Sequence, residues 1–158
     1  MGSSFSATNL YGNHYHSIHP KLYIGDKYSI YEKFFSSQQK LLVINATNYV
    51  KFNNKLHSIN IRVPVDDDLS DNAINIMFDN LDKITDIIDK HLKNGYVVLV
   101  HCVAGRQRSC AIVAGYLMKY HKLQQKEAIG FIKKKRPFAF FMNVNFKRSL
   151  IKFARILH

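Results

Sequence analysis

The chain has 158 residues, of which 47% are hydrophobic and 22% are charged, a composition typical of one ordinary globular domain. It contains no apolar run near the roughly 18 residues that would span a membrane, and its two cysteines are too few for a disulfide framework. A formal net charge of +12 favours anionic partners such as phosphorylated proteins, anionic lipid surfaces or RNA, without selecting one of them.

The first residues of the chain, 1–18, are rich in Ser, Asn, Tyr and His and show no periodicity, so they are predicted to form an arm before a domain at 19–158. Gly2 and Ser6 fit the pattern for N-myristoylation. Two cysteines that form no disulfide framework suit a reducing compartment. We therefore expect a cytoplasmic protein, with membrane association through Gly2 as a further hypothesis. The histidines near the start have no cysteine or carboxylate beside them, so no metal site is expected there.

Strands and helices alternate along the rest of the chain. The clearest helix is 72–93, because its apolar residues recur every three or four positions and Gly95 follows its end. Residues 57–65 alternate as a strand does, and Pro64 marks an edge or a bend. The other predicted strands are 21–26 with its turn, 41–45 and 96–100, and the other predicted helices are 30–37, 124–135, 146–157 and one that begins after residue 108. We expect an α/β fold with a mainly parallel central sheet flanked by helices.

The segment from Tyr96 to Met118 organises the chain. Its first five residues are apolar and mostly β-branched, as in a buried central strand, and helical spacing begins after Arg108. A strand, a short loop and a helix N-terminus present free backbone N–H groups and the positive end of the helix dipole. The sequence therefore predicts an anion-binding site built from backbone.

Cys102 and Arg108 stand at the two ends of that loop. Beside N–H donors, a helix N-terminus and a guanidinium, Cys102 is expected to be a thiolate at neutral pH. Arg108 has the planar fork that holds two phosphate oxygens at once. A thiolate in line with a bound phosphorus is a nucleophile for phosphoryl transfer through a phosphocysteine. The Ser109 hydroxyl is placed to donate to the sulfur and help it leave. The alternative is a structural cysteine beside an unrelated arginine.

The run from His101 to Ser109, HCVAGRQRS, resembles the His-Cys-x5-Arg-Ser signature of the cysteine-dependent protein phosphatases. Its Ala-Gly pair and final serine are most similar to the dual-specificity branch. The segments 22–25 and 143–146 also resemble parts of that domain, so the resemblance covers roughly residues 22–157. Met142 stands where the family commonly has proline, which puts the local turn in doubt.

The resemblance implies that the backbone N–H groups of Val103, Ala104 and Gln107 bind phosphate, while Gly105 permits close approach. Arg106 has two interpretations. A basic residue at this position also appears in phosphatases of phosphoinositides and of phosphatidylglycerophosphate, where a polyanionic head group needs a second cation. The preferred interpretation is a solvent-facing arginine, as in many protein phosphatases. The RNA 5′-triphosphatase branch usually has threonine and glycine after the signature arginine, so nucleic acid is a possible but not favoured partner.

A general acid must protonate the leaving oxygen of the phosphate ester. In the family it lies three residues after the proline of an Ile-Pro or Val-Pro strand, which corresponds to Asp67 here. Asp67 lies 35 residues before Cys102, a few more than is usual, whereas Asp71 lies 31 before it. Asp66 and Asp68 flank the preferred residue, and Asp71 also suits the first turn of the following helix.

Two further features each have two interpretations. Cys110 is interpreted as a small residue packed under the helix, with a redox partnership to Cys102 as the alternative. The cluster Lys133–Arg136, beside Phe138, Phe140 and Phe141, is either a solvated helix end or a patch that docks an anionic membrane or an acidic partner.

These observations predict a protein phosphatase that hydrolyses phosphotyrosine, phosphoserine and phosphothreonine through a phosphocysteine, with no cofactor or metal. The length of 158 residues leaves no room for pocket-deepening insertions, which favours dual specificity. The alternatives are a phosphatase of a phosphoinositide-type lipid or of an RNA 5′-phosphate, and a phosphate-binding module without turnover. Intact Cys102, Arg108 and Ser109 argue against a pure binding module.

Overall fold

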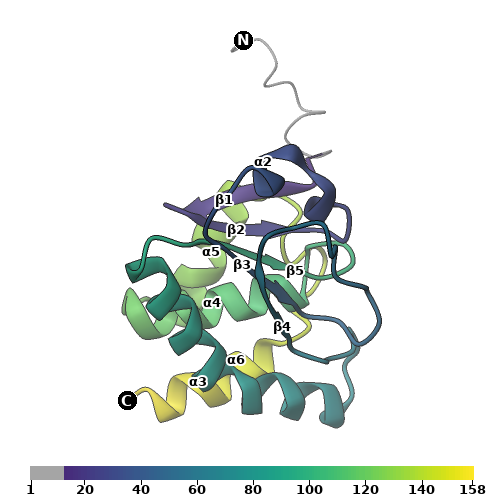
Figure 1. Ribbon diagram of the computed structural model, residues 1–158. Coiled ribbons are helices and arrows are strands. Elements are labelled where there is room, and N and C mark those ends of the chain that lie inside the picture. The colour runs from purple at the N-terminus through teal and green to yellow at the C-terminus, as the bar shows by residue number, and fades with distance from the viewer. Residues whose placement is uncertain (1–12) are drawn as a thin grey trace.

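The computed structural model describes residues 13–158, so the predicted modification of Gly2 lies outside the described residues. A five-stranded sheet with the order β1-β2-β5-β3-β4 forms its centre (Figure 1). The strands are β1 (Tyr15–His19), β2 (Leu22–Gly25), β3 (Leu41–Asn45), β4 (Ile59–Arg62) and β5 (Val97–His101). Only the β1–β2 pair is antiparallel, and the other neighbouring pairs are parallel. This confirms the predicted α/β fold and the central position of the signature strand, all five residues of which are buried.

The short first strand is a correction to the sequence analysis, which predicts no regular structure before residue 19. Tyr15–His19 instead pair with β2 along the edge of the sheet. Ile18 is buried, and the ring of Tyr15 packs against Phe34 and Phe35. The strand is thus held by a pairing partner and by aromatic contacts distant in sequence, and the polar composition of the segment does not reveal either.

The helices are divided unequally between the two faces of the sheet. They are the 3-10 helix η2 (Ser29–Tyr31), α2 (Lys33–Ser36), α3 (Asp71–Lys93), α4 (Arg108–Tyr120), α5 (Gln125–Lys135) and α6 (Lys147–Ile156). Alternate residues of β5 point to opposite faces of the sheet. Val98 and Val100 join the large core beneath α3 to α6, whereas Val97 and Leu99 join a smaller core that includes Phe35 of α2.

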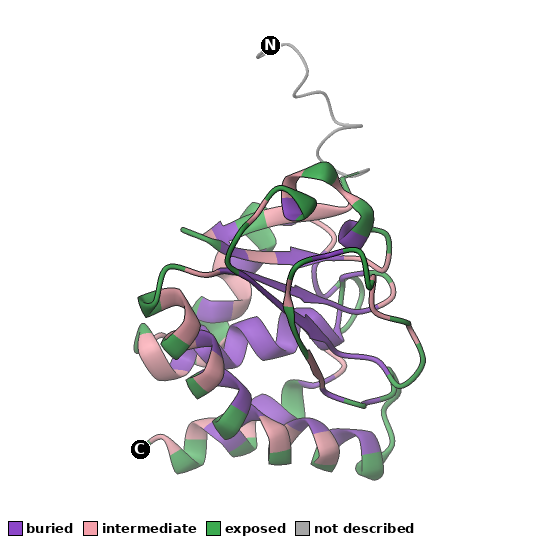
Figure 2. Cartoon of the chain, viewed as in Figure 1, coloured by how far each residue is buried: buried purple, intermediate pink, exposed green. Residues whose placement is uncertain are grey.

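Helix α4 lies in the middle of the helical layer, and every residue from Arg108 to Met118 is buried (Figure 2). Helix α3 packs closely against it, since a Cβ added at Gly115 would lie 3.0 Å from Leu81 Cδ2. The loop that precedes α4 is therefore fixed between a buried strand and a buried helix. It lies at the carboxyl edge of the parallel strands, which is where α/β sheets commonly place their ligands.

Candidate active site

The predicted nucleophile and its partners lie in the loop between β5 and α4. Cys102 is 2% exposed, and its Sγ lies 3.2 Å from Ser109 Oγ, so the hydroxyl can donate to the sulfur. Arg108 begins α4 and is 6% exposed. The structure thus brings Cys102, Arg108 and Ser109 into one buried turn.

The carbonyls of this loop are all held by groups outside it. The bonds run from His101 Nδ1 to Cys102 O (3.2 Å), Lys27 N to Val103 O (2.9 Å), Arg136 Nη2 to Ala104 O (3.3 Å), Arg136 Nε to Gly105 O (2.7 Å), Phe140 N to Arg106 O (2.7 Å) and Ala111 N to Gln107 O (2.8 Å). No described peptide bond is cis, and a planar trans peptide points its N–H opposite to its C=O. The N–H groups of residues 103–108 therefore turn to the inner side of the loop.

The N-terminus of α4 adds further donors. Gln107 occupies the N-cap position, yet its side chain makes no capping hydrogen bond. Instead Gln107 Nε2 donates to Asn143 O at 2.7 Å, and Gln107 Oε1 accepts from Asn145 N at 3.0 Å. The first N–H groups of a helix need a partner, and an anion can serve as that partner.

Arg108 is held at one end of its guanidinium and unpaired at another. Nη1 donates to Val65 O at 3.3 Å, which connects the loop to the segment that carries the candidate acids. Nε is buried and has no hydrogen-bond partner among residues 13–158. A buried donor without an acceptor is costly, and a phosphate oxygen would supply the missing acceptor.

Asp67 is connected to the loop by hydrogen bonds. Its Oδ1 accepts from Asn145 Nδ2 at 2.9 Å, and the backbone N–H of Asn145 bonds the Gln107 side chain. Asp67 itself is exposed and lies two residues after Val65, which Arg108 holds. The preferred general acid is therefore connected to the loop between β5 and α4 from two directions.

The neighbouring aspartates have other partners. The Asp66 carboxylate accepts from Asn48, whereas Asp71 forms an ion pair with Arg148 at 3.0 Å. Asp68 accepts hydrogen bonds from the hydroxyl and the backbone N–H of Ser70, and these lower its pKa below the ordinary value. A carboxyl with a lowered pKa is a poorer proton donor near neutral pH, which argues against Asp68.

The cationic cluster at the end of α5 differs from its prediction. Arg136 is 6% exposed and Phe140 is 2% exposed, so neither belongs to a surface patch. The guanidinium of Arg136 lies beneath the loop, where it donates hydrogen bonds to four acceptors. Only the lysines of residues 133–135 remain exposed at this helix end.

Arg106 lies on the outside of the same loop and is exposed. Its guanidinium lies over the rings of Phe138 and Phe141, with centroid distances of 5.1 and 5.9 Å. A cavity of about 150 Å³ opens beside it, lined also by His14 and Asp26. These residues leave Arg106 accessible to a ligand that extends from the loop.

Cys110 agrees with its interpretation as a packed residue. It is fully buried, and its thiol donates to Gly105 O at 3.5 Å. Burial raises the pKa of this thiol far above its ordinary value, which disfavours the reactive thiolate. Within residues 13–158 there is also no group of three His, Cys, Asp or Glu residues able to hold a metal, and no helix has the length and apolarity to cross a membrane.

Sequence reasoning missed three contributions to this site. The sequence pattern indicates neither the buried position of Arg136, nor the hydrogen bonds of the Gln107 side chain, nor the contact of Asn145 with Asp67. Asn143 contributes its carbonyl, which accepts from Gln107 Nε2. Met142 has a φ of 72°, so the turn at this residue is one that proline could not adopt. Only the Pro137 that follows the helix signals that Arg136 stands apart from the lysines before it.

Comparisons with known proteins agree on one family. The family model for the dual specificity phosphatase catalytic domain matches residues 22–156. "Putative tyrosine phosphatase 123R" of Invertebrate iridescent virus 6 is 34% identical over 111 residues, which are 70% of this chain and 75% of the viral protein. Human dual specificity protein phosphatase 8 is 33% identical over 89% of this chain but only 22% of its own length.

Solved structures show the same fold. Human DUSP28 superposes with a TM-score of 0.81 at 24% identity, covering 92% of this chain and 95% of that chain. PTPMT1 in complex with PI(5)P superposes with a TM-score of 0.67 at 22% identity, covering 92% of this chain and 97% of that chain. From its loop, its fold and the matched family model, the chain belongs to the dual-specificity phosphatase catalytic domain family.

Proposed function

We propose that this chain hydrolyses phosphomonoesters of tyrosine, serine and threonine in proteins, through a phosphocysteine formed on Cys102. The observation that carries the proposal is the orientation of the loop. Six carbonyls are held from outside the loop, and the Nε of Arg108 has no hydrogen-bond partner among residues 13–158. The site therefore offers donors where a phosphate would sit, beside a sulfur that can attack it.

Two steps follow from this arrangement. In the first, Cys102 Sγ forms a bond to phosphorus as the ester P–O bond breaks, and Asp67 gives its proton to the leaving oxygen. In the second, water attacks the phosphocysteine, Asp67 takes a proton from that water, and the S–P bond breaks to release phosphate. Ser109, 3.2 Å from the sulfur, stabilises the thiolate as it leaves.

A second candidate is the hydrolysis of a phosphoinositide-type lipid. Arg106 supports it, because its exposed guanidinium and the adjacent cavity could hold a second phosphate of a polyanionic head group. The neighbour PTPMT1 was solved with PI(5)P, although its likeness to this chain concerns the fold. We propose proteins as the main class of substrate. We also propose that residues 19–158 and strand β1 together form the catalytic domain.

One panel of substrates distinguishes these candidate functions. We would compare kcat/KM for phosphotyrosyl and phosphothreonyl peptides, a phosphoinositide in vesicles and RNA with a 5′-triphosphate. The proposal expects the phosphopeptides to be the best substrates, and a lead of the lipid or the RNA would refute that preference.

Two variants test the mechanism in the same panel. Cys102→Ser should abolish turnover and keep phosphate affinity, because the N–H groups and Arg108 remain. Arg108→Lys should lower kcat/KM by about 10²-fold or more, since lysine cannot hold two oxygens, whereas Arg148→Lys on the exposed face of α6 should not. Turnover by Cys102→Ser would overturn the mechanism.

A further inference from the structure

Arg136 is a buried cation that the reaction scheme above does not use. It follows α5 and precedes Pro137, and only 6% of it is exposed. Its Nε donates to Gly105 O at 2.7 Å and its Nη2 to Ala104 O at 3.3 Å. Neighbouring peptide groups at the centre of the phosphate-binding loop thus share one guanidinium.

The same guanidinium is held from its other side by the beginning of the described chain. Nη1 lies 2.7 Å from His16 Nδ1 and 3.4 Å from Asn13 O. Arginine has no acceptor, so the imidazole nitrogen must accept in this bond. Arg136 is therefore fixed between β1 and the loop, and it does not swing freely in the adjacent cavity.

The atoms of Arg136 pack closely against the loop at Gly105. Its φ is 66°, a conformation that favours glycine. A Cβ added here would lie 2.6 Å from Arg136 Nη2 and 2.7 Å from Gly25 O. The loop can take this path only with glycine at 105, and the guanidinium occupies the space beside it.

We propose that Arg136 is a positioning residue for the phosphate-binding loop, a role that rests on the proposed function of that loop. By holding the carbonyls of Ala104 and Gly105, it fixes the peptides whose N–H groups belong to Gly105 and Arg106. Because a trans peptide directs its N–H opposite to its C=O, the guanidinium behind the loop aims these donors at the phosphate.

The fork of arginine, as well as its charge, is needed for this role. Gly105 O and Ala104 O belong to different peptides, and they take donors from Nε and Nη2 of the same planar group. A lysine ammonium keeps the charge but lacks the fixed fork that serves both carbonyls and His16 together. Comparing lysine with methionine at this position therefore separates geometry from charge.

The test measures anion affinity, so it does not depend on turnover. Tungstate binding would be measured by calorimetry for the wild type, Arg136→Met, Arg136→Lys and the matched control Lys134→Met, whose side chain is exposed on α5. Charge-assisted hydrogen bonds of this kind correspond to about 10- to 100-fold in affinity. We expect Arg136→Met to weaken tungstate binding by that factor, Arg136→Lys by about tenfold, and Lys134→Met by less than twofold.

A chemical readout distinguishes positioning from general destabilisation. In folded Arg136→Met, millimolar guanidinium should restore part of the tungstate affinity and of kcat/KM, and it should leave the wild type unchanged. Where Arg136→Met does not fold, Arg136→Lys carries the test. Wild-type tungstate affinity in either folded variant would overturn the positioning role. Absence of wild-type turnover on the whole substrate panel would instead refute the proposed function and leave the affinity comparison valid.

Discussion

At the scale of single residues, Asp67 differs from the aspartates around it by its partner. Asn145 connects it to the loop, whereas Asp68 is held by Ser70 and Asp71 by Arg148. For a substrate with a poor leaving group, Asp67→Asn should lower kcat by roughly 10² to 10⁴. For an activated aryl phosphate, which departs without a proton, the loss should be much smaller. The measurement is kcat for both substrates across pH, which should give a bell-shaped profile in the wild type.

The neighbouring residues are the controls for this prediction. Asp66→Asn and Asp68→Asn should show no dependence on the leaving group, and Asp71→Asn should mainly lower stability by removing a carboxylate from the first turn of α3. A leaving-group dependence that appears in Asp71→Asn and is missing in Asp67→Asn would assign the acid to Asp71, the residue favoured by spacing to Cys102.

His101 gives a prediction about pH. It is fully buried, its Nδ1 bonds Cys102 O, and its Nε2 has no hydrogen-bond partner among the described residues. Burial lowers the pKa of this imidazole below its ordinary value. The unfolded chain therefore binds a proton at about pH 6.5 that the folded chain does not yet bind, so the free energy of unfolding should fall as pH decreases from about 7 through that value.

Urea unfolding at a series of pH values measures whether the free energy of unfolding falls as pH decreases. His101→Gln should reduce the loss of stability between about pH 7 and the lowered pKa, relative to the wild type. His91→Gln is a control, because the His91 side chain is part-buried on α3, where it bonds Ile87 O and packs against the ring of Tyr96. Identical pH dependence in the wild type and His101→Gln would contradict the prediction.

At the scale of elements, α3 begins after a serine N-cap, which also holds one of the aspartates that precede the helix. Ser70 Oγ accepts from Ala73 N at 3.1 Å and donates to Asp68. Ser70→Ala should lower the free energy of unfolding by about 1 kcal/mol, the usual cost of losing such a cap. Chemical denaturation would measure it, with Ser58→Ala, outside any helix, as the control. An equal stability of Ser70→Ala and Ser58→Ala would show that the cap contributes nothing.

The elements also show which features local sequence predicts. The apolar periodicity of 72–93 and the β-branched run before Cys102 report burial directly, and α3 and β5 formed where they were expected. Strand β1 depends on pairing with β2, which directly follows it, and on contacts of Tyr15 with Phe34 and Phe35. The burial of Arg136 depends on acceptors far along the chain, 31 positions away for Gly105. A lysine-rich stretch appears the same in sequence whether or not one member turns inward, so Arg136 could be identified only in three dimensions.

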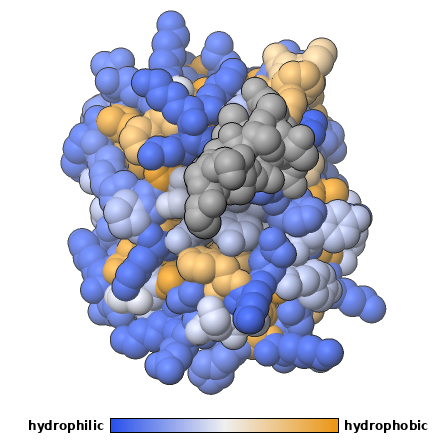
Figure 3. Space-filling model, turned by 90° about the horizontal axis from the view of Figure 1, so that it is seen from above, coloured by the Kyte–Doolittle hydropathy of each residue, from blue (hydrophilic) through white to orange (hydrophobic). Residues whose placement is uncertain are grey.

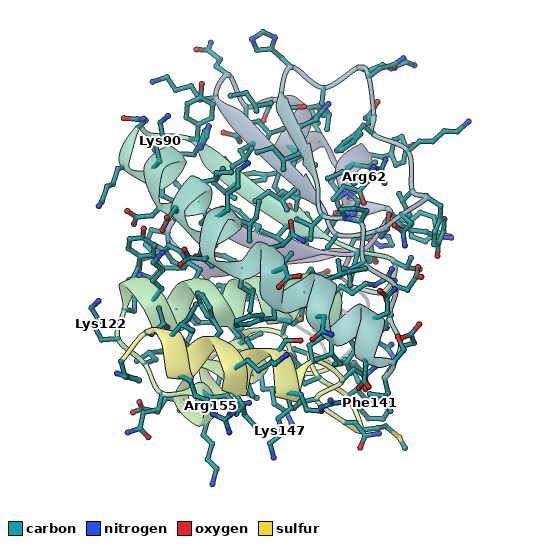
Figure 4. All side chains as sticks on the ribbon, turned by 90° about the horizontal axis from the view of Figure 1, so that it is seen from below. Arg62, Lys90, Lys122, Phe141, Lys147 and Arg155 are labelled. Atoms are coloured by element: carbon teal, nitrogen blue, oxygen red, sulfur yellow. The ribbon has the colours of Figure 1, made fainter. Side chains whose placement is uncertain are left out.

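At the scale of the whole molecule, the cationic residues remain largely at the surface. Lys147 and Arg155 extend outward from α6 (Figure 4). The visible part of the upper face is mainly hydrophilic, with hydrophobic side chains in separate groups (Figure 3). Membrane binding by such a surface would be electrostatic, at about 1 kcal/mol per basic residue near an anionic leaflet.

If Gly2 is myristoylated, this basic surface should contribute to membrane binding. A single myristoyl chain binds membranes only marginally, so the basic residues must act as the second signal. Gly2→Ala should release the protein to the soluble fraction, and raised salt should weaken binding of the wild type to anionic vesicles. Fractionation and intact-mass analysis from the native cell measure both, and an unmodified N-terminus would end the hypothesis.

The long-range bonds of Arg136 also set an order of assembly. A ribosome delivers the chain from its N-terminus, so His16 is made first, the loop with Cys102 later, and the guanidinium that joins them last. His16 and Arg136 are 120 positions apart. A nascent chain that already carries Cys102 lacks the hydrogen bonds from Arg136 to its loop until α5 and the residue after it have been made. The proposed support of the loop by Arg136 would therefore be completed late in synthesis, after most of the domain has been made.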